Sequence, residues 1–404
     1  YSKGEDHFFC TKHFVRNQSK RKYFFKKGVF PYSYMSSLSR LQESELPPIA
    51  CFKNDLSGED LPEEDYELAQ KVWSLFQCET MQDYMEIYLL CDVLLLADVF
   101  EAFRSKSLVD YGLDPVFYFS TPHFTMDAFL KQSQVSLDLI LDLNQYLFLI
   151  QGIRGGLSVV SKRFSSANNP ELGARYNPKR ASRYILYLDA NNLYGKAMME
   201  PMPTSDFLWM ESSELHFDYI LSLPPDGENG CIVECDLEYP ENLHELHADF
   251  PLAPHRHKVC LTELSPTARQ ICERNSLKHS VGTEKLMATF LPRRAYVVHF
   301  RNLQLYVKLG MKVSSIHRGI KFKQSPVFKE YIEFNSSKRA LATNSFDTDY
   351  YKLLSNSLFG KTIERPEKRC RVVLTSDPAK HQKLVGSPCY KASKIIHPKL
   401  VGVT

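Results

Sequence analysis

The segment from Tyr184 to Met198, YILYLDANNLYGKAM, constrains the fold more than any other part of the sequence. The run Tyr184–Leu188 is apolar without polar alternation, which predicts a strand that is covered on both faces. Asp189 comes directly after it, so a carboxylate is predicted where a buried strand opens into a cleft. A carboxylate is costly to desolvate there unless a cation meets it, and a hard ion such as Mg²⁺ is the usual one. Taken alone, the segment slightly favours the alternative, in which Asp189 is a turn residue or helix cap.

A second group of polar residues is predicted on one helix. The segment Tyr350–Glu364, YYKLLSNSLFGKTIE, follows NSFDTD, which offers helix caps. A helix here has an apolar packing face formed by Tyr351, Leu354 and Leu358. A second stripe presents an ammonium, an amide and a ring, at Lys352, Asn356, Phe359 and finally Ile363. Gly360 beside this stripe lets a flat group approach the backbone, so the pattern fits a nucleotide-facing surface. The alternative is an amphipathic helix whose lysine is only solvated.

The remaining sequence indicates a soluble α/β (α+β) protein of more than one domain. A length of 404 residues allows two or three domains, and a helical pattern over about 65–106 is followed by strand-like runs such as CIVECDLEY and RAYVVHF. The net charge of +3 does not by itself require a nucleic-acid partner. Ten cysteines at irregular positions indicate reduced thiols and an intracellular protein. The longest apolar run, Tyr88–Phe100, contains two aspartates and is shorter than the about 20 residues of a membrane span, so no membrane is predicted.

Cysteines and histidines between residues 231 and 260 raise a separate hypothesis, a zinc site. They are Cys231, Cys235, His244, His247, His255, His257 and Cys260. Cys231 and Cys235 fall in a predicted strand, where residues four apart are separated by roughly 13 Å at about 3.3 Å each. Two such thiolates cannot share one tetrahedral ion, so the sequence favours a strand without zinc.

Two motifs together resemble those of a known family. LDANNLYGKAM and, much later in the chain, KLLSNSLFGK resemble motifs A and B of the family B DNA polymerases. The likeness is greatest to the protein-primed branch found in linear plasmids, viruses and large self-synthesising DNA transposons. The matching positions are Asp189, Leu193 and Tyr194 in motif A, and Lys352, Asn356, Ser357, Phe359 and Gly360 in motif B.

Further stretches extend the resemblance to nearly the whole chain. GIRGG (Gly152–Gly156) resembles the Tyr/Ile-X-Gly-Gly element, which in the family contacts the template strand. That contact would fall here to Arg154, Gly155 and Gly156. YLLCD resembles the third exonuclease motif, in which Tyr88 would orient the attacking water and Asp92 would bind a metal ion.

The resemblance implies a site for two Mg²⁺ or Mn²⁺ ions and a deoxynucleoside triphosphate. Asp189 would be one of two carboxylates that bridge ions about 4 Å apart. Tyr194, next to Leu193 in the motif, would exclude a ribose 2′-hydroxyl by its bulk. Lys352 would neutralise triphosphate charge, and Asn356 would help to hold the nucleotide.

Other implied contacts come from the two helices around motif B. Phe359 and Gly360 would face the base, while Ser357 and Lys361 would contact DNA. The preceding helix is predicted to start at Pro326. Its Lys338 or its Arg339 would approach the same phosphates if the two helices pack antiparallel, and the sequence does not choose between them.

The chain also departs from the family pattern. A third motif of the form Tyr-X-Asp-Thr-Asp, which carries a second catalytic aspartate, does not follow motif B, and FDTD (Phe346–Asp349) precedes it and is interpreted as a helix cap. The first two exonuclease motifs are not found either, so the chain is interpreted as a middle section. Ile153 stands where many relatives have Tyr, and Phe359 replaces the commoner Tyr. Asn192 and Gly195 stand where the wider family has Ser and Pro.

The resemblance implies a right-hand polymerase, with a partial RNase H-like 3′–5′ exonuclease domain before the palm and fingers. The predicted divisions are 1–150 for the partial exonuclease domain, 151–204 for the start of the palm, 205–322 for the palm with an insertion, 323–365 for the fingers, and 366–404 for a return toward the palm. The implied function is template-directed DNA synthesis on primer-template DNA from deoxynucleoside triphosphates, with a terminal (priming) protein as a further partner. This chain alone is expected to bind DNA without extending it. The alternative is a non-catalytic DNA-binding remnant of a mobile element or virus.

Overall fold

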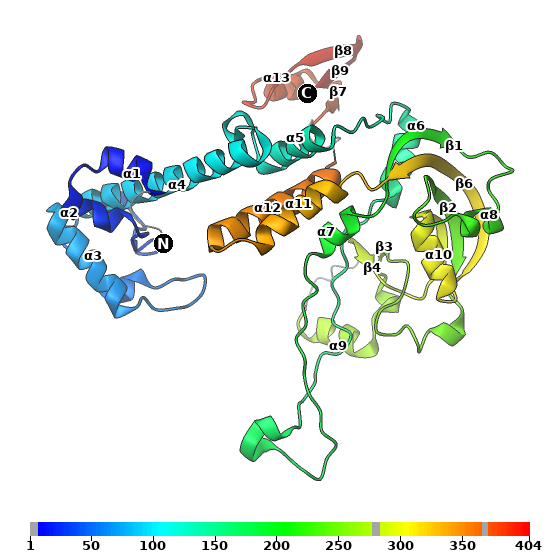
Figure 1. The fold of residues 1–404 in the computed structure, drawn as a ribbon, viewed down its shortest axis with the longest axis horizontal. Coiled ribbons are helices and arrows are strands. Elements are labelled where there is room, and N and C mark those ends of the chain that lie inside the picture. The colour runs from blue at the N-terminus through cyan, green and yellow to red at the C-terminus, as the bar shows by residue number, and fades with distance from the viewer. Residues whose placement is uncertain (1–6, 277–282, 366–370) are drawn as a thin grey trace. The chain divides into compact units, whose positions relative to one another are not determined.

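The computed structural model describes residues 7–276, 283–365 and 371–404, which belong to two compact units. The units are Tyr1–Lys131 and Gln132–Thr404. Figure 1 shows that helices and strands are both present, and this confirms the predicted α/β class. The predicted division at residue 150 falls inside the second unit, because the helix that ends at Gly152 packs on the sheet of that unit.

The first unit is helical in its described residues. Its α-helices are α1 (Phe9–Phe14), α2 (Gln18–Arg21), α3 (Glu63–Phe76), α4 (Met81–Tyr111) and α5 (Thr121–Ser133), the last of which runs two residues into the second unit. Its 3₁₀ helices are Lys22–Phe24, Leu38–Gln42, Ile49–Phe52 and Pro115–Phe117. The helical pattern predicted over residues 65–106 is confirmed by α3 and α4.

Helix α4 is well defined at both ends. Thr80 and Asp83 form a reciprocal capping box at its start, and Gly112 ends it in the left-handed conformation at φ 62°. Asp98 is buried on this helix and accepts hydrogen bonds from the backbone N of Cys10 at 2.6 Å and from the hydroxyl of Thr11 at 2.6 Å. This buried carboxylate therefore ties α1 to α4.

The second unit is built on a four-stranded antiparallel sheet with the order β1-β6-β2-β5. The strands are β1 (Met202–Trp209), β2 (Asn229–Glu238), β5 (Arg293–His299) and β6 (Lys312–Ser325). In the register, Val233 lies opposite Gly319 on one side and Val298 on the other. The strands predicted from CIVECDLEY and RAYVVHF are confirmed as β2 and β5.

Helices cover both faces of this sheet (Figure 1). On one face, alternate residues of β2 pack against α8 (Phe217–Ser222) and α10 (Phe300–Lys308). On the other face, α6 (Leu143–Gly152) places Phe148 against Val297 and Ile320. The sheet is therefore the middle layer of a three-layer arrangement.

Cys231 and Cys235 lie on the same core-facing side of β2 and are buried. Burial raises the pKa of each thiol to about 12. Within the described residues, no three His, Cys, Asp or Glu side chains are grouped so that they could hold a metal ion. The two cysteines act as small apolar residues of the core.

Smaller elements complete the second unit. They are α7 (Leu193–Met198), α9 (Pro266–Arg274), α11 (Lys329–Ala340), α12 (Ser345–Thr362), α13 (Pro378–Val385), the strand pair β3 (His255–Lys258) and β4 (Glu284–Met287), and a sheet of order β7-β9-β8 from Val373–Thr375, Leu400–Val403 and Ser393–His397. Its 3₁₀ helices are Pro170–Arg175, Glu241–Leu243 and Leu261–Glu263. The helices of the described residues are too short or too polar to span a bilayer.

The strand predicted over Tyr184–Leu188 is wrong. These residues belong to no strand, and Tyr187 and Leu188 are 96% and 83% exposed. A strand is stabilised by hydrogen bonds to a neighbouring strand, and in the described chain pairing stops at Arg183, which forms an isolated bridge with Asn168. The apolar run therefore precedes Asp189 as an extended, uncovered segment.

Candidate nucleotide-binding site

Helices α11 and α12 are consecutive and lie side by side with opposite directions (Figure 1), as predicted. Asn344 caps α12 by accepting a hydrogen bond from the backbone N of Asp347 at 3.0 Å, so the prediction that NSFDTD offers a helix cap is confirmed, whereas FDTD itself lies in the first turn of the helix. The start predicted at Pro326 is wrong, because α11 begins at Lys329. Strand β6 continues to Ser325, so the chain needs a turn before the helix can begin.

The two predicted faces of α12 are confirmed. Tyr351, Leu354 and Leu358 are buried, with 3% of Tyr351 and none of the two leucines exposed. On the other stripe, Lys352 and Asn356 are exposed and Phe359 is half-buried. The buried face fixes the rotation of the helix, so the polar stripe must face outward.

Motif A reaches the helix pair through a tight turn. Asn192 adopts the left-handed conformation at φ 55° and starts the short helix α7. Its side-chain amide lies 3.4 Å from the hydroxyl of Ser336 on α11. The ring of Tyr194 stacks on that of Phe359, with centroids 4.1 Å apart and planes 10° apart. Two contacts thus join motif A to both helices.

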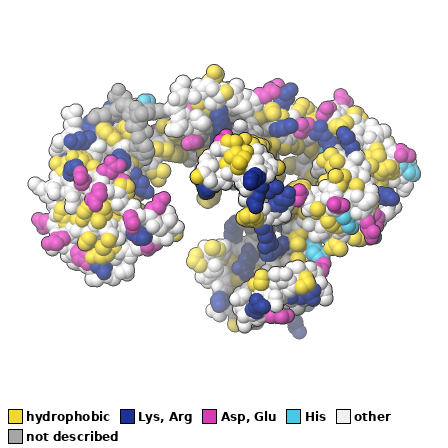
Figure 2. Space-filling model, turned by 90° about the horizontal axis from the view of Figure 1, so that it is seen from below, with side chains coloured by type: hydrophobic (Ala, Val, Ile, Leu, Met, Phe, Trp, Pro, Cys, Tyr) yellow, Lys and Arg dark blue, Asp and Glu magenta, His cyan; other side chains and the backbone are white. Residues whose placement is uncertain are grey.

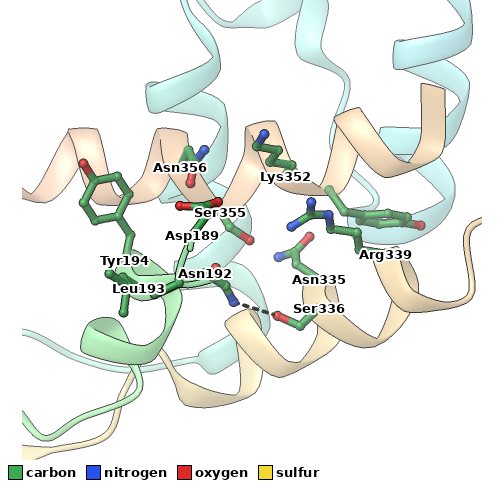
Figure 3. Close-up of a pocket in the computed structure, with 12 residues that line it drawn as sticks. Asp189, Asn192, Leu193, Tyr194, Asn335, Ser336, Arg339, Lys352, Ser355 and Asn356 are labelled. Atoms are coloured by element: carbon green, nitrogen blue, oxygen red, sulfur yellow. Dashed lines mark hydrogen bonds between the residues drawn. The ribbon is translucent and has the colours of Figure 1, made fainter. Parts of the chain in front are cut away.

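These elements enclose a cavity of about 310 Å³, shown in Figure 3. Its lining is Asp189, Ala190, Asn192, Leu193 and Tyr194 from motif A, Asn335, Ser336 and Arg339 from α11, and Tyr351, Lys352, Ser355 and Asn356 from α12. Arg339 and Lys352 contribute two cations on neighbouring helices, and Asp189 contributes one carboxylate. The cavity can therefore receive an anionic group between the helices and a cationic one beside Asp189.

Most residues predicted from the two motifs meet at this cavity. Of the two candidates on α11, Arg339 lines it, whereas the ammonium of Lys338 lies 5.4 Å from the ring centroid of Phe334. Gly360 does not line the cavity, but the space that a side chain would fill beside it is open. Ser357 and Lys361 also lie outside its lining, and the ammonium of Lys361 pairs with Glu364 at 2.5 Å.

On α11 and α12, four residues of the lining were not predicted from the sequence: Asn335, Ser336, Tyr351 and Ser355. Asn335 and Ser336 precede Arg339 by four and three residues, and Ser355 precedes Phe359 by four. Helical spacing places such residues on the same side, so this signal could have found them once the helices were accepted.

The two-ion metal site is not assembled by the described residues. Asp189 is the only carboxylate in the lining of the cavity, and the described chain has no group of three side chains that could hold a metal ion. Two-ion phosphoryl transfer uses at least two carboxylates. The donor set in this cavity therefore does not fit a pair of Mg²⁺ ions.

The predicted template element, Gly152–Gly156, is anchored to the sheet. The guanidinium of Arg154 donates to the carbonyl of Val297 at 2.7 Å and lies 3.9 Å from the ring centroid of Tyr296. Gly155 and Gly156 are exposed, with open space beside them. The glycine backbone is thus accessible, while one guanidinium nitrogen of Arg154 is already bonded to the carbonyls of Gly152 and Val297.

The predicted exonuclease residues lie one turn apart on α4 of the first unit. The hydroxyl of Tyr88 is hydrogen-bonded to that of Tyr32 at 2.7 Å, and Asp92 lies 3.7 Å from the ammonium of Lys27. Burial, the Tyr32 hydrogen bond and the nearby Asp92 all raise the pKa of Tyr88. Because no metal-binding group of three forms among the described residues, the exonuclease role stays a prediction.

Comparison with known proteins now identifies the family. A sequence model described as "DNA polymerase type B, organellar and viral" matches residues 15–397. Because the match covers nearly the whole chain, this protein belongs to the organellar and viral type B DNA polymerases. No curated protein matches the chain.

Solved structures of phi29 DNA polymerase are also similar. The orthorhombic crystal form has a TM-score of 0.42 at 14% identity, over 84% of this chain and 48% of that one. The complex with primer-template DNA and incoming nucleotides has a TM-score of 0.36 at 14% identity, over 83% and 47%. The complex with single-stranded DNA has 0.38 at 14%, over 86% and 46%. The chain thus spans about half the length of these polymerases.

Proposed function

We propose that this chain carries the nucleotide-binding and DNA-binding parts of a protein-primed DNA polymerase, which copies a template from deoxynucleoside triphosphates. The observation that carries the proposal is the cavity in which Lys352 and Arg339 face motif A. A triphosphate is a multiply charged anion, and paired cations on rigid helices suit it. A terminal protein is proposed as a further partner because the family resemblance lies with the protein-primed branch.

The roles proposed for the lining residues follow from their places. Lys352 and Arg339 would neutralise the phosphates, and Asn356 would hydrogen-bond the same nucleotide. Tyr194 would lie beneath the sugar and exclude a 2′-hydroxyl, with Phe359 stacked beside it. Because Tyr194 and Phe359 are in contact in this structure, a base can enter between them only if the two rings separate.

The domain roles are proposed on the same basis. Helices α11 and α12, within residues 323–365, would be the fingers. Residues 151–204 and 205–322 would form the palm and its insertion, and residues 366–404 would return toward the palm. The first unit would be the partial exonuclease domain, with Tyr88 and Asp92 as its motif.

The single carboxylate limits what this chain is proposed to do alone. Binding of nucleotide and DNA needs cations and donors, and the cavity has both. Extension of a primer needs ions bridged by at least two carboxylates. This same observation favours the second candidate function, a DNA-binding protein without catalysis.

The first test is nucleotide binding by the chain itself. In a titration with a fluorescent deoxynucleoside triphosphate, Lys352→Ala should weaken binding roughly 10- to 150-fold, as expected for loss of a charge-assisted contact worth about 1.5–3 kcal/mol. Lys308→Ala is the matched control, because Lys308 is also an exposed helical lysine but lies on α10. Equal affinities of the two variants would show that the cavity is not the nucleotide site.

A second test separates the two candidate functions. A primer-template should be retained on a filter by the chain, while a primer-extension gel with Mg²⁺ should show no product. Robust extension would mean that a further carboxylate, such as Asp347 or Asp349, joins Asp189. Tyr194→Val should in addition narrow the preference for deoxyribonucleoside over ribonucleoside triphosphate in the binding titration.

A further inference from the structure

A basic segment lies between the template element and motif A. Residues 157–183 leave the sheet after α6 and return to motif A as a long excursion that carries the 3₁₀ helix Pro170–Arg175 (Figure 1). The cations of this segment are Lys162, Arg163, Arg175, Lys179, Arg180 and Arg183, and its one carboxylate is Glu171. These residues give the segment a net charge of +5, whereas the whole chain carries +3, so the rest of the protein is net acidic.

The six cations are free to meet a partner. All of them are exposed, and within residues 7–276, 283–365 and 371–404 none of their side chains forms an ion pair or a hydrogen bond. In Figure 2, Lys and Arg side chains gather in the middle of the face that is drawn. Such a concentration of like charge repels itself unless an anion neutralises it.

Two asparagines hold four of these cations on one fixed loop, residues 168–183, which we name the Asn-tied loop. The backbones of Asn168 and Arg183 pair in both directions, at 2.8 and 2.7 Å. The side-chain amide of Asn168 donates to the carbonyls of Asn177, Arg180 and Ala181 at 3.0, 3.3 and 3.2 Å, and its oxygen accepts from the backbone N of Asn177 at 2.9 Å. Asn169 is buried and donates to the carbonyl of Arg183 at 3.1 Å.

This internal bonding matters for binding. The loop also contains two Asn-Pro pairs, Asn169–Pro170 and Asn177–Pro178, and each proline further restricts the backbone. A loop that is already ordered loses little conformational entropy when it binds. Arg175, Lys179 and Arg180 are thus presented from a pre-organised backbone.

We propose that the Asn-tied loop binds the phosphate backbone of the nucleic acid whose end lies at the cavity; this inference rests on the proposed function. Arg183 precedes Asp189 by six residues, and six residues span at most about 20 Å at about 3.3–3.6 Å each. DNA presents one charge about every 1.7 Å along its axis, so a duplex held at Asp189 carries many phosphates within that reach. Arginines outnumber lysines among the six cations, and their planar forks match phosphate oxygens.

The test measures how DNA affinity depends on salt. We compare the unchanged chain with the variant Arg175→Gln/Lys179→Gln/Arg180→Gln in filter binding to a primer-template duplex and to a single strand. Each lost phosphate contact should lower the slope of log affinity against log salt by about 1, so the variant should lose two to three units of slope and bind at least about tenfold more weakly at 0.1 M salt. The matched control removes the same charge elsewhere, in Lys308→Gln/Lys312→Gln/Lys380→Gln, all three being exposed.

A second measurement localises the contact. Trypsin cleaves after exposed Lys and Arg, so duplex DNA should slow cleavage after Arg175, Lys179 and Arg180 in the unchanged chain. Asn168→Ala keeps every charge but frees the loop, so it should speed this cleavage and weaken DNA binding while leaving the salt slope unaltered.

The outcomes distinguish this inference from the proposed function. A loop variant with the slope and affinity of the control overturns the inference, while a normal effect of Lys352→Ala on nucleotide binding would leave the proposed function standing. A chain that binds neither nucleotide nor DNA removes both. If the loop variant binds DNA normally but no longer binds vesicles containing phosphatidylserine, the loop is a membrane surface and the inference is wrong.

Discussion

Helix α12 and the segment Tyr184–Leu188 are both rich in apolar residues, and one lines the cavity while the other leads into its lining at Asp189, yet only the helix has the structure that its sequence pattern predicts. The apolar face of α12 is buried, whereas the apolar run before Asp189 is exposed and forms no strand. A helix makes its backbone hydrogen bonds within its own residues. A strand requires a second strand from elsewhere in sequence. The sequence of a segment can therefore predict a helix by itself. A strand can be predicted only if a partner strand is also found.

This difference continues into the cavity. The wall formed by α11 and α12 is fixed by buried residues such as Leu354 and Leu358. The opposite wall, around Asp189, follows an uncovered segment and is joined to the helices by the Asn192–Ser336 contact and the Tyr194–Phe359 stack. We expect the two walls to respond differently to substitution, and the following measurements, ordered by size of effect, test this.

The largest difference in the free energy of unfolding should be found between the variants Leu354→Ala and Leu186→Ala. Leu354 is fully buried, so its truncation should lower the free energy of unfolding by about 2–5 kcal/mol. Leu186 is 75% exposed, so the same truncation should change it by less than about 0.5 kcal/mol. Chemical denaturation of both variants gives the two values. Similar losses would mean that the apolar run is buried as a strand after all.

A second measurement uses pH to probe the four-stranded sheet. Its strands pair with one another, so its hydrogen bonds, like those of α12, are made within the element. Burial, with the charge of Arg301, lowers the pKa of His299 from 6.5 to about 4. As the pH falls, His299 is protonated in the unfolded chain before it is protonated in the folded one. The stability that neutral His299 contributes is therefore complete above about pH 6.5 and is lost as the pH falls toward 4. The loss is up to about 3 kcal/mol at about 1.4 kcal/mol per pKa unit.

The control for this pH effect is His299→Asn, which keeps an acceptor for the backbone N of Arg301 at the start of α10. Denaturation curves at several pH values should show a shallower decline for the variant. Burial also lowers the pKa of His255 to about 4, so part of the decline in stability should remain in the variant. Identical declines in both proteins would mean that His299 titrates normally in the fold.

The smallest effect should come from the stack between Tyr194 and Phe359. A double-mutant cycle with Tyr194→Ala and Phe359→Ala should give a coupling of about 0.5–1.5 kcal/mol in the free energy of unfolding. Excess nucleotide should reduce the coupling if the rings separate to admit it. Additive losses would show that motif A is not held against α12 in solution.

The sequence was most informative where interactions are local. It predicted α3, α4 and the pairing of α11 with α12, and it brought Asp189, Tyr194 and Lys352 to one site. It could not predict that Arg154 is held by the carbonyl of Val297, because 143 residues separate the two and no pattern links them. The choice between Lys338 and Arg339 likewise depended on how α11 is rotated about its axis. The sequence does not predict this rotation, because α11 is only weakly amphipathic.

The turn at Asn192 also limits how motif A can vary between related proteins. A methyl group added to Gly195 would lie 2.4–2.6 Å from side-chain atoms of Asn192, closer than atoms that are not bonded can approach. Proline at position 195, which the wider family has, therefore conflicts with asparagine at position 192, whereas the shorter serine found there in the wider family leaves room. The two departures are therefore coupled: glycine at position 195 lets the Asn192 side chain keep its present position, and proline at 195 would require that side chain to move.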